Sequence, residues 1–446
     1  MNILSLFDGM SCGMLAMLKA GIQVDNYYAY EIDKYAIQTS QHNFPKIKQC
    51  GDVFEGDFSQ YKGIDYLIGG SPCQRWSIAQ SPDKRETTAS GIGWELFSQY
   101  VRALHEAEPK FFIYENNKSM SKAIRESITY AFGFEPIFIN SALLSAQNRQ
   151  RLYWVGKRNA DGTYSKVDVP QPEDRGILLR DVLDGVTDRE KDRAVIGSTG
   201  RTTEREYFKK FQGNMAYEPV GTTKDGKSYC LTQGYSNGSG EKIGNYAAHT
   251  LQKGCKSMVA EPVNVTADGK AQCLRATCYK DTVRNIAGNN IDKKTGVAIP
   301  VRVGLFPTSD GRLLDSQGMR IYSIEAKSVT QSAQGGGMGA KTGLYAVPVE
   351  FDNDIPVKAV SGADGKTYTV YEVKDGTITI KGKTYPIKLV DGYYIIRKLT
   401  VSECKRLQTV PEWYEFPVSD TQAYKMLGNG WTVDVIAHLI NATENT

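Results

Sequence analysis

The sequence predicts an α/β protein: a doubly wound, mainly parallel sheet that is interrupted by a long β-rich insert. Two observations support this prediction. Over the first 158 residues, short apolar runs alternate with helical patterns, as they do in parallel sheets covered by helices. After about residue 175, glycine, threonine and serine become frequent and the helical periodicity fades until it returns at Thr400. We therefore expect two α/β segments that complete one domain on either side of the insert.

Apolar runs locate the strands and helices of the first segment. Strands are expected at residues 3–7, 27–32, 64–69, 110–114 and 152–155. One helix is expected at residues 14–20, where Gly21 ends it, and another at 95–107, whose apolar residues share one face. Sheets of this kind bind their ligands at the carboxyl ends of the strands, so the functional residues should follow the strands.

The insert carries a less regular β pattern. Its clearest part is a meander of four strands, expected at residues 368–373, 377–380, 384–390 and 393–396. Glycine-containing turns at residues 374–376, 381–383 and 391–392 separate these strands. Upstream, loosely similar segments recur at uneven spacing, which favours an irregular β-rich module over a solenoid.

The composition favours a large intracellular enzyme. The chain has 446 residues and a formal net charge of only +4, so any contact with nucleic acid must come from a locally basic face. The eight cysteines are scattered without Cys-x-x-Cys pairs, and only four histidines accompany them, so neither a metal site nor a disulfide framework is expected. No apolar run is long enough for a membrane span and no secretory leader is recognisable, so we expect a cytoplasmic protein.

The loop after the first strand has the residues of a nucleoside-binding turn. Residues 7–13 are mostly small, which lets a ligand approach the backbone, and they lead into a helix N-terminus. Glu31, at the end of the second strand, is placed to accept from ribose hydroxyls, and Asp52, after the next helix, from an adenine amino group. Each feature alone is equally a tight turn or a solvated acid, but together they indicate a nucleoside cofactor. The spacing leaves NAD and S-adenosylmethionine both open.

A thiol, a carboxyl and two guanidinium groups accompany later strands. Cys73 lies in a Gly-Ser-Pro-Cys-Gln sequence just after the strand at 64–69, and Glu115 stands where the following strand ends. Arg149 and Arg151 come at alternate positions before another apolar strand, so their side chains would point to the same side. A lone cysteine is more often a small buried apolar residue, yet these groups together match one reaction.

That reaction is methyl transfer to carbon 5 of cytosine. A thiolate that adds to carbon 6 makes carbon 5 electron-rich, a protonated carboxyl can donate to N3, and an arginine can hold the exocyclic oxygen. Because an unperturbed thiol is little ionised near neutral pH, Arg149, Arg151 or a helix N-terminus must favour the thiolate.

In this order, the motifs resemble those of the DNA cytosine-5 methyltransferases. The resemblance covers residues 1–158 and 397–441 and rests on residues 7–13, Glu31, Asp52, 71–74, 115–116, Gln147-x-Arg149-x-Arg151, 397–400, 406–408, Pro411 and 427–430. Ser11-Cys12 stands where many members have two glycines, and Asn117 stands where a valine is usual. Asn429-Gly430-Trp431 is similar to the de novo branch of the family, in which case Trp431 would pack on the cofactor.

The resemblance implies an S-adenosylmethionine-dependent, Rossmann-like methyltransferase fold with an inserted target-recognition domain. Residues 1–175 would form the first part of the catalytic domain, 176–395 the target-recognition domain and 396–446 the rest of the catalytic domain. Cys73 would be the nucleophile, Glu115 the partner of N3, and Arg151 with Arg149 the clamp on the ring oxygen. The residues implied to bind S-adenosylmethionine are Phe7, Asp8, Gly9, Ser11, Gly13, Glu31, Ile32, Asp52, Val53, Pro72, Asn429 and Trp431.

The implied substrate is double-stranded DNA, from which the target cytosine must leave the base stack. Residues 74–94 are expected to close over the flipped base, with a plain surface loop as the alternative. Candidate contacts to phosphates or bases are Arg275, Arg284, Arg302, Arg320 and the glycines at 335–337, each equally a residue without contact to DNA. A monomer is expected, and a cognate restriction endonuclease acting separately is a candidate partner.

Three alternatives stay open at this point. One is an RNA cytosine-5 methyltransferase acting on transfer RNA, although an insert of about 220 residues, the size of a domain, favours DNA. A second is a catalytically inactive relative, which would have lost Cys73 or Glu115, both of which are present. The third is an NAD-dependent oxidoreductase, which would suit the first loop but leave the thiol, the carboxyl and the arginines without a joint role.

Overall fold

The computed structural model describes residues 1–72, 75–77, 82–184, 246–249, 259–262, 298–332, 343–349, 351, 358–362 and 364–446. The chain divides into two compact units. The first comprises Met1–Ile177, Arg302–Ser323 and Ser328–Thr446, and the second comprises Leu178–Val301 and Ile324–Lys327. The predicted boundaries of the target-recognition domain stay a prediction.

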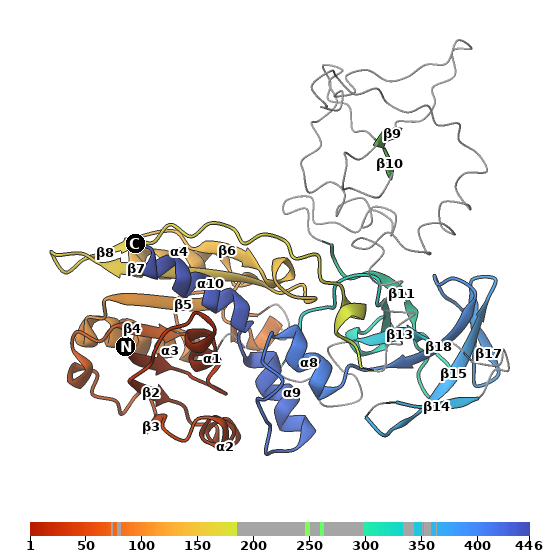
Figure 1. Ribbon diagram of the computed structural model, residues 1–446, viewed down its shortest axis with the longest axis horizontal. Coiled ribbons are helices and arrows are strands. Elements are labelled where there is room, and N and C mark those ends of the chain that lie inside the picture. Colours follow the sequence, from red (N-terminus) through yellow and green to blue (C-terminus); the bar gives the residue numbers. More distant parts are fainter. Residues whose placement is uncertain are drawn as a thin grey trace, which may run out of the picture. The chain divides into compact units, whose positions relative to one another are not determined.

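The first unit contains a mainly parallel sheet, as the sequence predicts (Figure 1). Its strands are β1 (Asn2–Leu6), β2 (Asn26–Tyr30), β3 (Lys48–Gly51), β4 (Tyr66–Gly69), β5 (Phe111–Asn117), β6 (Ile137–Asn140), β7 (Gln150–Arg158) and β8 (Tyr164–Lys166). They lie in the order β3-β2-β1-β4-β5-β7-β6, with β8 beside β7. The pairs among β1 to β5 are parallel, whereas β7 runs antiparallel to β5, β6 and β8. The chain reverses its direction of travel at β1, which has β2 on one side and β4 on the other, and this switch point is where such sheets bind ligands.

Helices cover both faces of this sheet. The described helices of this unit are α1 (Cys12–Lys19), α2 (Lys34–Asn43), α3 (Ile92–Ala107), α4 (Lys122–Phe132), α8 (Val401–Leu407), α9 (Asp420–Asn429) and α10 (Val433–Glu444). Neighbouring residues of β4 show the two faces: a Cβ on Gly13 of α1 would meet Ile68 Cδ1 at 2.3 Å, and a Cβ on Gly69 would meet the ring of Tyr100 in α3 at 3.1 Å. α10 packs beside α1, so elements from opposite parts of the sequence share one face (Figure 1).

Local sequence explains where the helices begin and end. α4 begins after Ser121, whose hydroxyl accepts from the backbone N–H of Ile124 at 3.2 Å, and it ends at Gly133, which takes the left-handed conformation with φ of 83°. Ile124, Ile128 and Phe132 follow one another at helical spacing and are buried together against the sheet. Capping and apolar periodicity therefore agree on this element.

A second, mostly antiparallel sheet follows in the same unit. Its strands are β11 (Arg302–Leu305), β12 (Arg320–Ser323), β13 (Leu344–Pro348), β14 (Ala359–Ser361), β15 (Thr367–Lys374), β16 (Thr377–Ile380), β17 (Lys383–Pro386) and β18 (Gly392–Arg397). The four strands predicted for residues 368–396 all occur. The predicted meander is wrong at its last step, because β18 pairs with β15 and not with β17. β15 lies between β18 and β16, and its Val373 pairs with Gly392 of β18 on one edge and with Ile378 of β16 on the other.

The second unit is described over few residues. A 3-10 turn spans Leu179–Val182, and β9 (Tyr246–His249) pairs antiparallel with β10 (Val259–Pro262). Arg275, Arg284 and the glycines at 335–337 lie outside the described residues. Arg302 and Arg320 belong to the second sheet, where both bind Asp315. Among the helices that the structure describes, none is long and apolar enough to cross a membrane.

Candidate active site

The loop between β1 and α1 has a strained backbone. Phe7, Gly9 and Ser11 have φ angles of 57°, 60° and 60°, in the left-handed region that residues with a side chain rarely adopt. A Cβ on Gly9 would meet no atom within 4 Å, so space is open at this point. Phe7 itself is partly buried against the core. The loop thus presents an accessible backbone at the switch point of the sheet.

Asp8, Ser11 and Gly13 shape this loop from inside the protein. The Asp8 carboxyl accepts hydrogen bonds from the hydroxyls of Ser5, Ser11 and Tyr27, at 2.6, 2.5 and 2.7 Å. Burial raises the pKa of Asp8 to about 6. Gly13 lets α1 pack closely on the sheet, because a Cβ at this position would collide with Ile68 of β4. The side chains of Asp8 and Ser11 therefore stabilise the turn itself.

Glu31 connects the loop to the end of β2. Its Oε2 accepts from the backbone N–H of Gly9 at 2.8 Å, and its Oε1 accepts from Ile32 and Asp33 N–H groups, each also at 2.8 Å. The carboxylate is fixed by these three donors and retains lone pairs for hydroxyl donors. The neighbouring Ile32 side chain is 72% exposed, which is unusual for isoleucine. An oriented carboxylate and an uncovered apolar surface thus lie side by side.

A similar pair follows β3. Asp52 Oδ1 accepts from the backbone N–H of Phe54 at 3.0 Å, Val53 is buried, and the Phe54 ring is 46% exposed. The remaining predicted cofactor residues, Pro72 after β4 and Asn429 at the end of α9, are exposed. The sheet edge therefore carries acids with exposed apolar neighbours at the ends of two adjacent strands.

Glu115 forms the centre of the second half of the site. It lies in β5 and is buried, and its two carboxylate oxygens have different partners. Arg151 Nε lies 2.9 Å from Oε1, and Trp431 Nε1 donates to Oε2 at 3.0 Å. A Cβ on Gly70 would lie 3.0 Å from Oε2, so the glycine makes room for the carboxylate. The geometry thus brings together predicted residues from β5, β7 and the segment before α10.

Arg149 has a different role from Arg151 in this structure. Its buried guanidinium donates to the backbone carbonyls of Gly428, Gly430 and Gln331, at 3.2, 2.9 and 3.3 Å. These bonds attach the turn between α9 and α10 to the end of β7. Arg149 therefore holds the segment that carries Trp431, whereas Arg151 pairs with Glu115.

A buried polar network holds the backbone that leads to Cys73. Ser71 and Tyr114 share a hydrogen bond of 2.6 Å between their hydroxyls, and Asn116 Nδ2 donates to the Ser71 carbonyl at 3.2 Å and to the Tyr114 hydroxyl at 3.1 Å. All three residues are buried. The network fixes residues 70–72 next to Glu115, but Cys73 and Gln74 themselves lie outside the described residues.

The cysteines that the structure describes are poor nucleophiles. Burial raises the pKa of the Cys12 thiol to about 12 and holds the pKa of Cys404 well above its usual range. Cys50 is half-buried, and its pKa is likewise raised by burial. These three thiols stay protonated near neutral pH, so in this part of the chain none offers a thiolate.

The described part of the predicted lid is tied to the protein. Trp76 is fully buried and donates from Nε1 to Glu86 Oε2 at 3.2 Å, and the same oxygen accepts from the backbone N–H of Gly93 at 3.1 Å. Arg85 Nη2 donates to the Ser119 carbonyl at 2.8 Å. Glu86 thus connects Trp76 to the start of α3, and Arg85 connects the segment to Ser119. Closure over a base stays a prediction.

Sequence reasoning missed several residues of the site. Tyr114 and Glu86 had no local signal, because their residue types are ordinary for a strand and a loop. Outside the site, Glu403 was also missed, although Thr400-x-x-Glu403 has the spacing of a capping box, which the structure contains. Its further bond to Arg397 could not be read from that spacing.

Comparison with known proteins identifies the family of the chain. The model of the C-5 cytosine-specific DNA methylase family matches residues 1–445. Orphan methyltransferase M.SPRI of Bacillus phage SPR is 34% identical over 173 residues, which cover 35% of this chain and 38% of that protein. Type II methyltransferase M1.ScrFI of Lactococcus lactis subsp. cremoris is 29% identical over 177 residues, covering 37% and 44% respectively. The chain thus spans less than half the length of these two relatives.

Among solved structures, methyltransferase EhMeth of Entamoeba histolytica aligns with a TM-score of 0.49 and 11% identity, over 100% of this chain and 98% of that one. The family model, in contrast, matches nearly every residue of the chain. On that match, the chain belongs to the C-5 cytosine-specific DNA methylase family.

Proposed function

We propose that the chain transfers the methyl group of S-adenosylmethionine to carbon 5 of a cytosine in DNA. The single observation that carries the proposal is the Glu115 carboxylate, held by Arg151 and Trp431 beside the backbone that leads to Cys73. Family membership supports the reaction type. The cofactor, the residue roles and the DNA substrate are part of the proposal.

The residues at the ends of β1, β2 and β3 fit S-adenosylmethionine. Open space at Gly9 admits a ligand to the loop backbone, and the fixed carboxylate of Glu31 can accept from ribose hydroxyls. Ile32 and Phe54 supply the exposed apolar surface that an adenine ring needs, with Asp52 placed for its amino group. The bound cofactor would supply an electrophilic methyl group.

The chemistry follows from the chain's own groups. The Cys73 thiolate adds to carbon 6 of cytosine, and Glu115 gives a proton to N3 so that the ring does not accumulate negative charge. Arg151 holds the ring oxygen. With a methyl group supplied to the electron-rich carbon 5, that carbon loses its proton to solvent. The carbon 5–carbon 6 double bond then forms again as the thiolate leaves, and N3 returns its proton to Glu115. Arg149 acts by holding the turn that carries Trp431.

The substrate must reach this site as an extrahelical base. Carbon 6 of a stacked cytosine is inaccessible to a thiolate, so the cytosine is flipped out of duplex DNA. Residues 176–395 provide the sequence readout and residues 74–94 the cover over the base. The relative named as a type II methyltransferase favours a restriction-modification context, with a separate endonuclease as partner. Transfer RNA stays the second candidate substrate.

Trapping with 5-fluorocytosine tests the proposal. Duplex DNA of random sequence containing this base, with S-adenosylmethionine, should give a covalent protein–DNA adduct that survives denaturing gel electrophoresis, because fluorine blocks release of carbon 5. Cys73→Ser should abolish the adduct, and Cys50→Ser should keep it. Adduct formation with RNA but not with DNA would overturn the DNA substrate, and an adduct that persists in Cys73→Ser would overturn the nucleophile.

A further inference from the structure

The strained loop after β1 keeps its shape through anchors on several elements. Glu31 accepts from Gly9, and the three hydroxyls around Asp8 come from β1, β2 and the loop itself. Left-handed residues with side chains are sterically unfavourable, so such a turn persists only where its surroundings impose it. Each anchor therefore contributes to the conformation that a cofactor would meet.

One anchor comes from a distant part of the sequence. The hydroxyl of Tyr414 donates to the backbone carbonyl of Met10 at 2.5 Å, across 404 positions of sequence. Both residues are buried, with exposed fractions of only 1%. Burial holds the pKa of Tyr414 well above its usual range, so the hydroxyl stays protonated and remains a donor. Removal of the Tyr414 hydroxyl would therefore leave the buried Met10 carbonyl without this donor.

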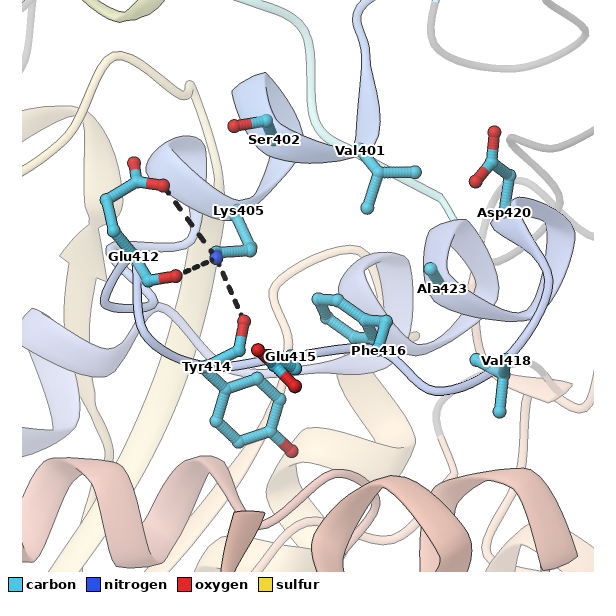
Figure 2. Close-up of a pocket in the computed structure, with 10 residues that line it drawn as sticks. All are labelled: Val401, Ser402, Lys405, Glu412, Tyr414, Glu415, Phe416, Val418, Asp420 and Ala423. Atoms are coloured by element: carbon cyan, nitrogen blue, oxygen red, sulfur yellow. Dashed lines mark hydrogen bonds and ion pairs between the residues drawn. The ribbon is translucent and has the colours of Figure 1, made fainter. Parts of the chain in front are cut away.

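Lys405 fixes the backbone of Tyr414 in turn. Its ammonium group, on α8, donates to the carbonyls of Glu412 and Tyr414 at 2.7 and 2.9 Å and is almost fully buried. Figure 2 shows these bonds at the edge of a pocket between α8 and α9, with the Tyr414 ring directed away from the lysine. On its other side, the segment is held by Asn43 of α2, whose Oδ1 accepts from the Glu415 N–H at 2.9 Å. The tyrosine is thus positioned by a cation that never touches the loop.

We propose that Tyr414 and Lys405 are positioning residues for the cofactor loop: Tyr414 holds the Met10 carbonyl, and Lys405 acts through Tyr414. This proposal rests on the proposed function only where it names S-adenosylmethionine as the ligand of the loop. The effect of Tyr414 on the loop conformation does not depend on a ligand, so it can be tested without one.

The ligand-free test is hydrogen exchange of the loop amides in the full-length protein. Tyr414→Phe removes one hydroxyl and should raise the exchange rates of the amides of residues 9–12 by about tenfold, as expected when a buried carbonyl loses its donor. The matched control is Tyr424→Phe, which removes a hydroxyl that donates to the Leu399 carbonyl at 2.8 Å. It should leave these amides unchanged. Equal rates in wild type and Tyr414→Phe would overturn the proposal.

The functional consequence is measured by calorimetric binding of S-adenosylmethionine. Tyr414→Phe should weaken the affinity about fivefold to twentyfold, with kcat at saturating cofactor changed less than about twofold. Lys405→Met should weaken it less, and adding Lys405→Met to Tyr414→Phe should have no further effect, because the lysine acts through the tyrosine. If the two substitutions weaken the affinity additively, Lys405 does not act through Tyr414. A wild-type protein that binds no S-adenosylmethionine would overturn the proposed function, while the exchange experiment would still decide the role of Tyr414.

Discussion

Two side chains hold the oxygens of Glu115, and they come from residues far apart in sequence. Arg151 belongs to β7, and Trp431 precedes α10. A carboxylate fixed in this way is oriented before any base arrives, which lowers the cost of reaching the reactive geometry. The sequence predicted all three as site residues, but its pattern gave no sign of the bond from Trp431 to Glu115, and the contact of Trp431 with the cofactor stays a prediction.

Trp431→Phe separates these two roles, because it keeps an aromatic ring and removes the N–H. We expect kcat to fall by about tenfold while the dissociation constant of S-adenosylmethionine changes less than about twofold. Steady-state kinetics and calorimetry provide the two numbers. Trp413→Phe, at an exposed tryptophan, is the control for the ring change and should leave both unchanged. A loss of cofactor affinity as large as the loss of kcat would place Trp431 at the cofactor instead.

Asp8 gives the folded protein a distinct pH dependence. Its pKa is raised by burial from 3.8 to about 6, so between these values the folded protein keeps a proton that the unfolded chain releases. Raising the pH through this window therefore costs stability, by up to about 1.4 kcal/mol per pH unit, and the loss is constant above it. Asp8→Asn cannot titrate, so it should gain stability relative to wild type from pH 4 to 6 and then remain level. Urea denaturation at pH 4, 5, 6 and 7 measures the free energy of unfolding of both proteins. If the difference between wild type and Asp8→Asn is the same at every pH, Asp8 does not have a raised pKa in the folded protein.

At the scale of elements, apolar runs predicted the strands that lie inside the sheet. β3 was missed because it is short and polar, and it lies at the sheet's edge with no fully buried residue. β5 proved longer than predicted, since Glu115, Asn116 and Asn117 continue the strand in spite of their polarity. Their partners in β7 explain this, because Asn117 pairs with Arg151 in register. Strand ends set by a neighbour's hydrogen bonds cannot be read from one segment alone.

The junction between β18 and α8 depends on a buried ion pair. Arg397 donates from Nη1 and Nη2 to the two oxygens of Glu403 at 2.7 and 2.6 Å, and both side chains are buried. Arg397→Met leaves the carboxylate without its cation and should destabilise the protein by about 3–5 kcal/mol in chemical denaturation. Arg302 and Asp315 form a comparable pair whose side chains are 47% and 52% exposed, so Arg302→Met should cost less than about 0.5 kcal/mol. Similar losses of stability in both variants would show that burial does not determine how much an ion pair contributes to the free energy of unfolding.

At the scale of the molecule, the sequence predicted that segments on either side of the insert build one domain. α10 and α1 pack together, the Tyr66 hydroxyl of β4 shares a hydrogen bond of 2.6 Å with Thr443, and Tyr414 reaches Met10. The sequence could not predict which parts of the insert belong to the same compact unit as the α/β sheet. Residues 302–323 and 328–397 cluster with the α/β sheet, a partition set by tertiary contacts that a change in composition does not reveal.

This shared core makes a fragment experiment decisive. Residues 1–184 alone lack the apolar face of α10, so we expect no cooperative thermal transition by circular dichroism. Co-expression with residues 298–446 should restore one, together with binding of S-adenosylmethionine. Val435 and Ile436 are fully buried in α10. A fragment of residues 298–446 that carries Val435→Asp and Ile436→Asp should therefore restore neither the cooperative transition nor the binding. A cooperative transition of residues 1–184 alone would contradict the shared core.

The same pairing of α1 with α10 has a consequence for how the protein is made. α1 leaves the ribosome some 414 residues before α10 begins, which at roughly 5–20 residues per second amounts to about 20–80 s of synthesis. During that time the growing chain carries β1 and Glu31, and later Glu115, but it lacks Tyr414 as the donor to the Met10 carbonyl until near its end, and likewise Trp431 as the donor to Glu115. A partly synthesised chain therefore lacks both of these contacts, and the face of α1 that packs on α10 stays uncovered until α10 has been made.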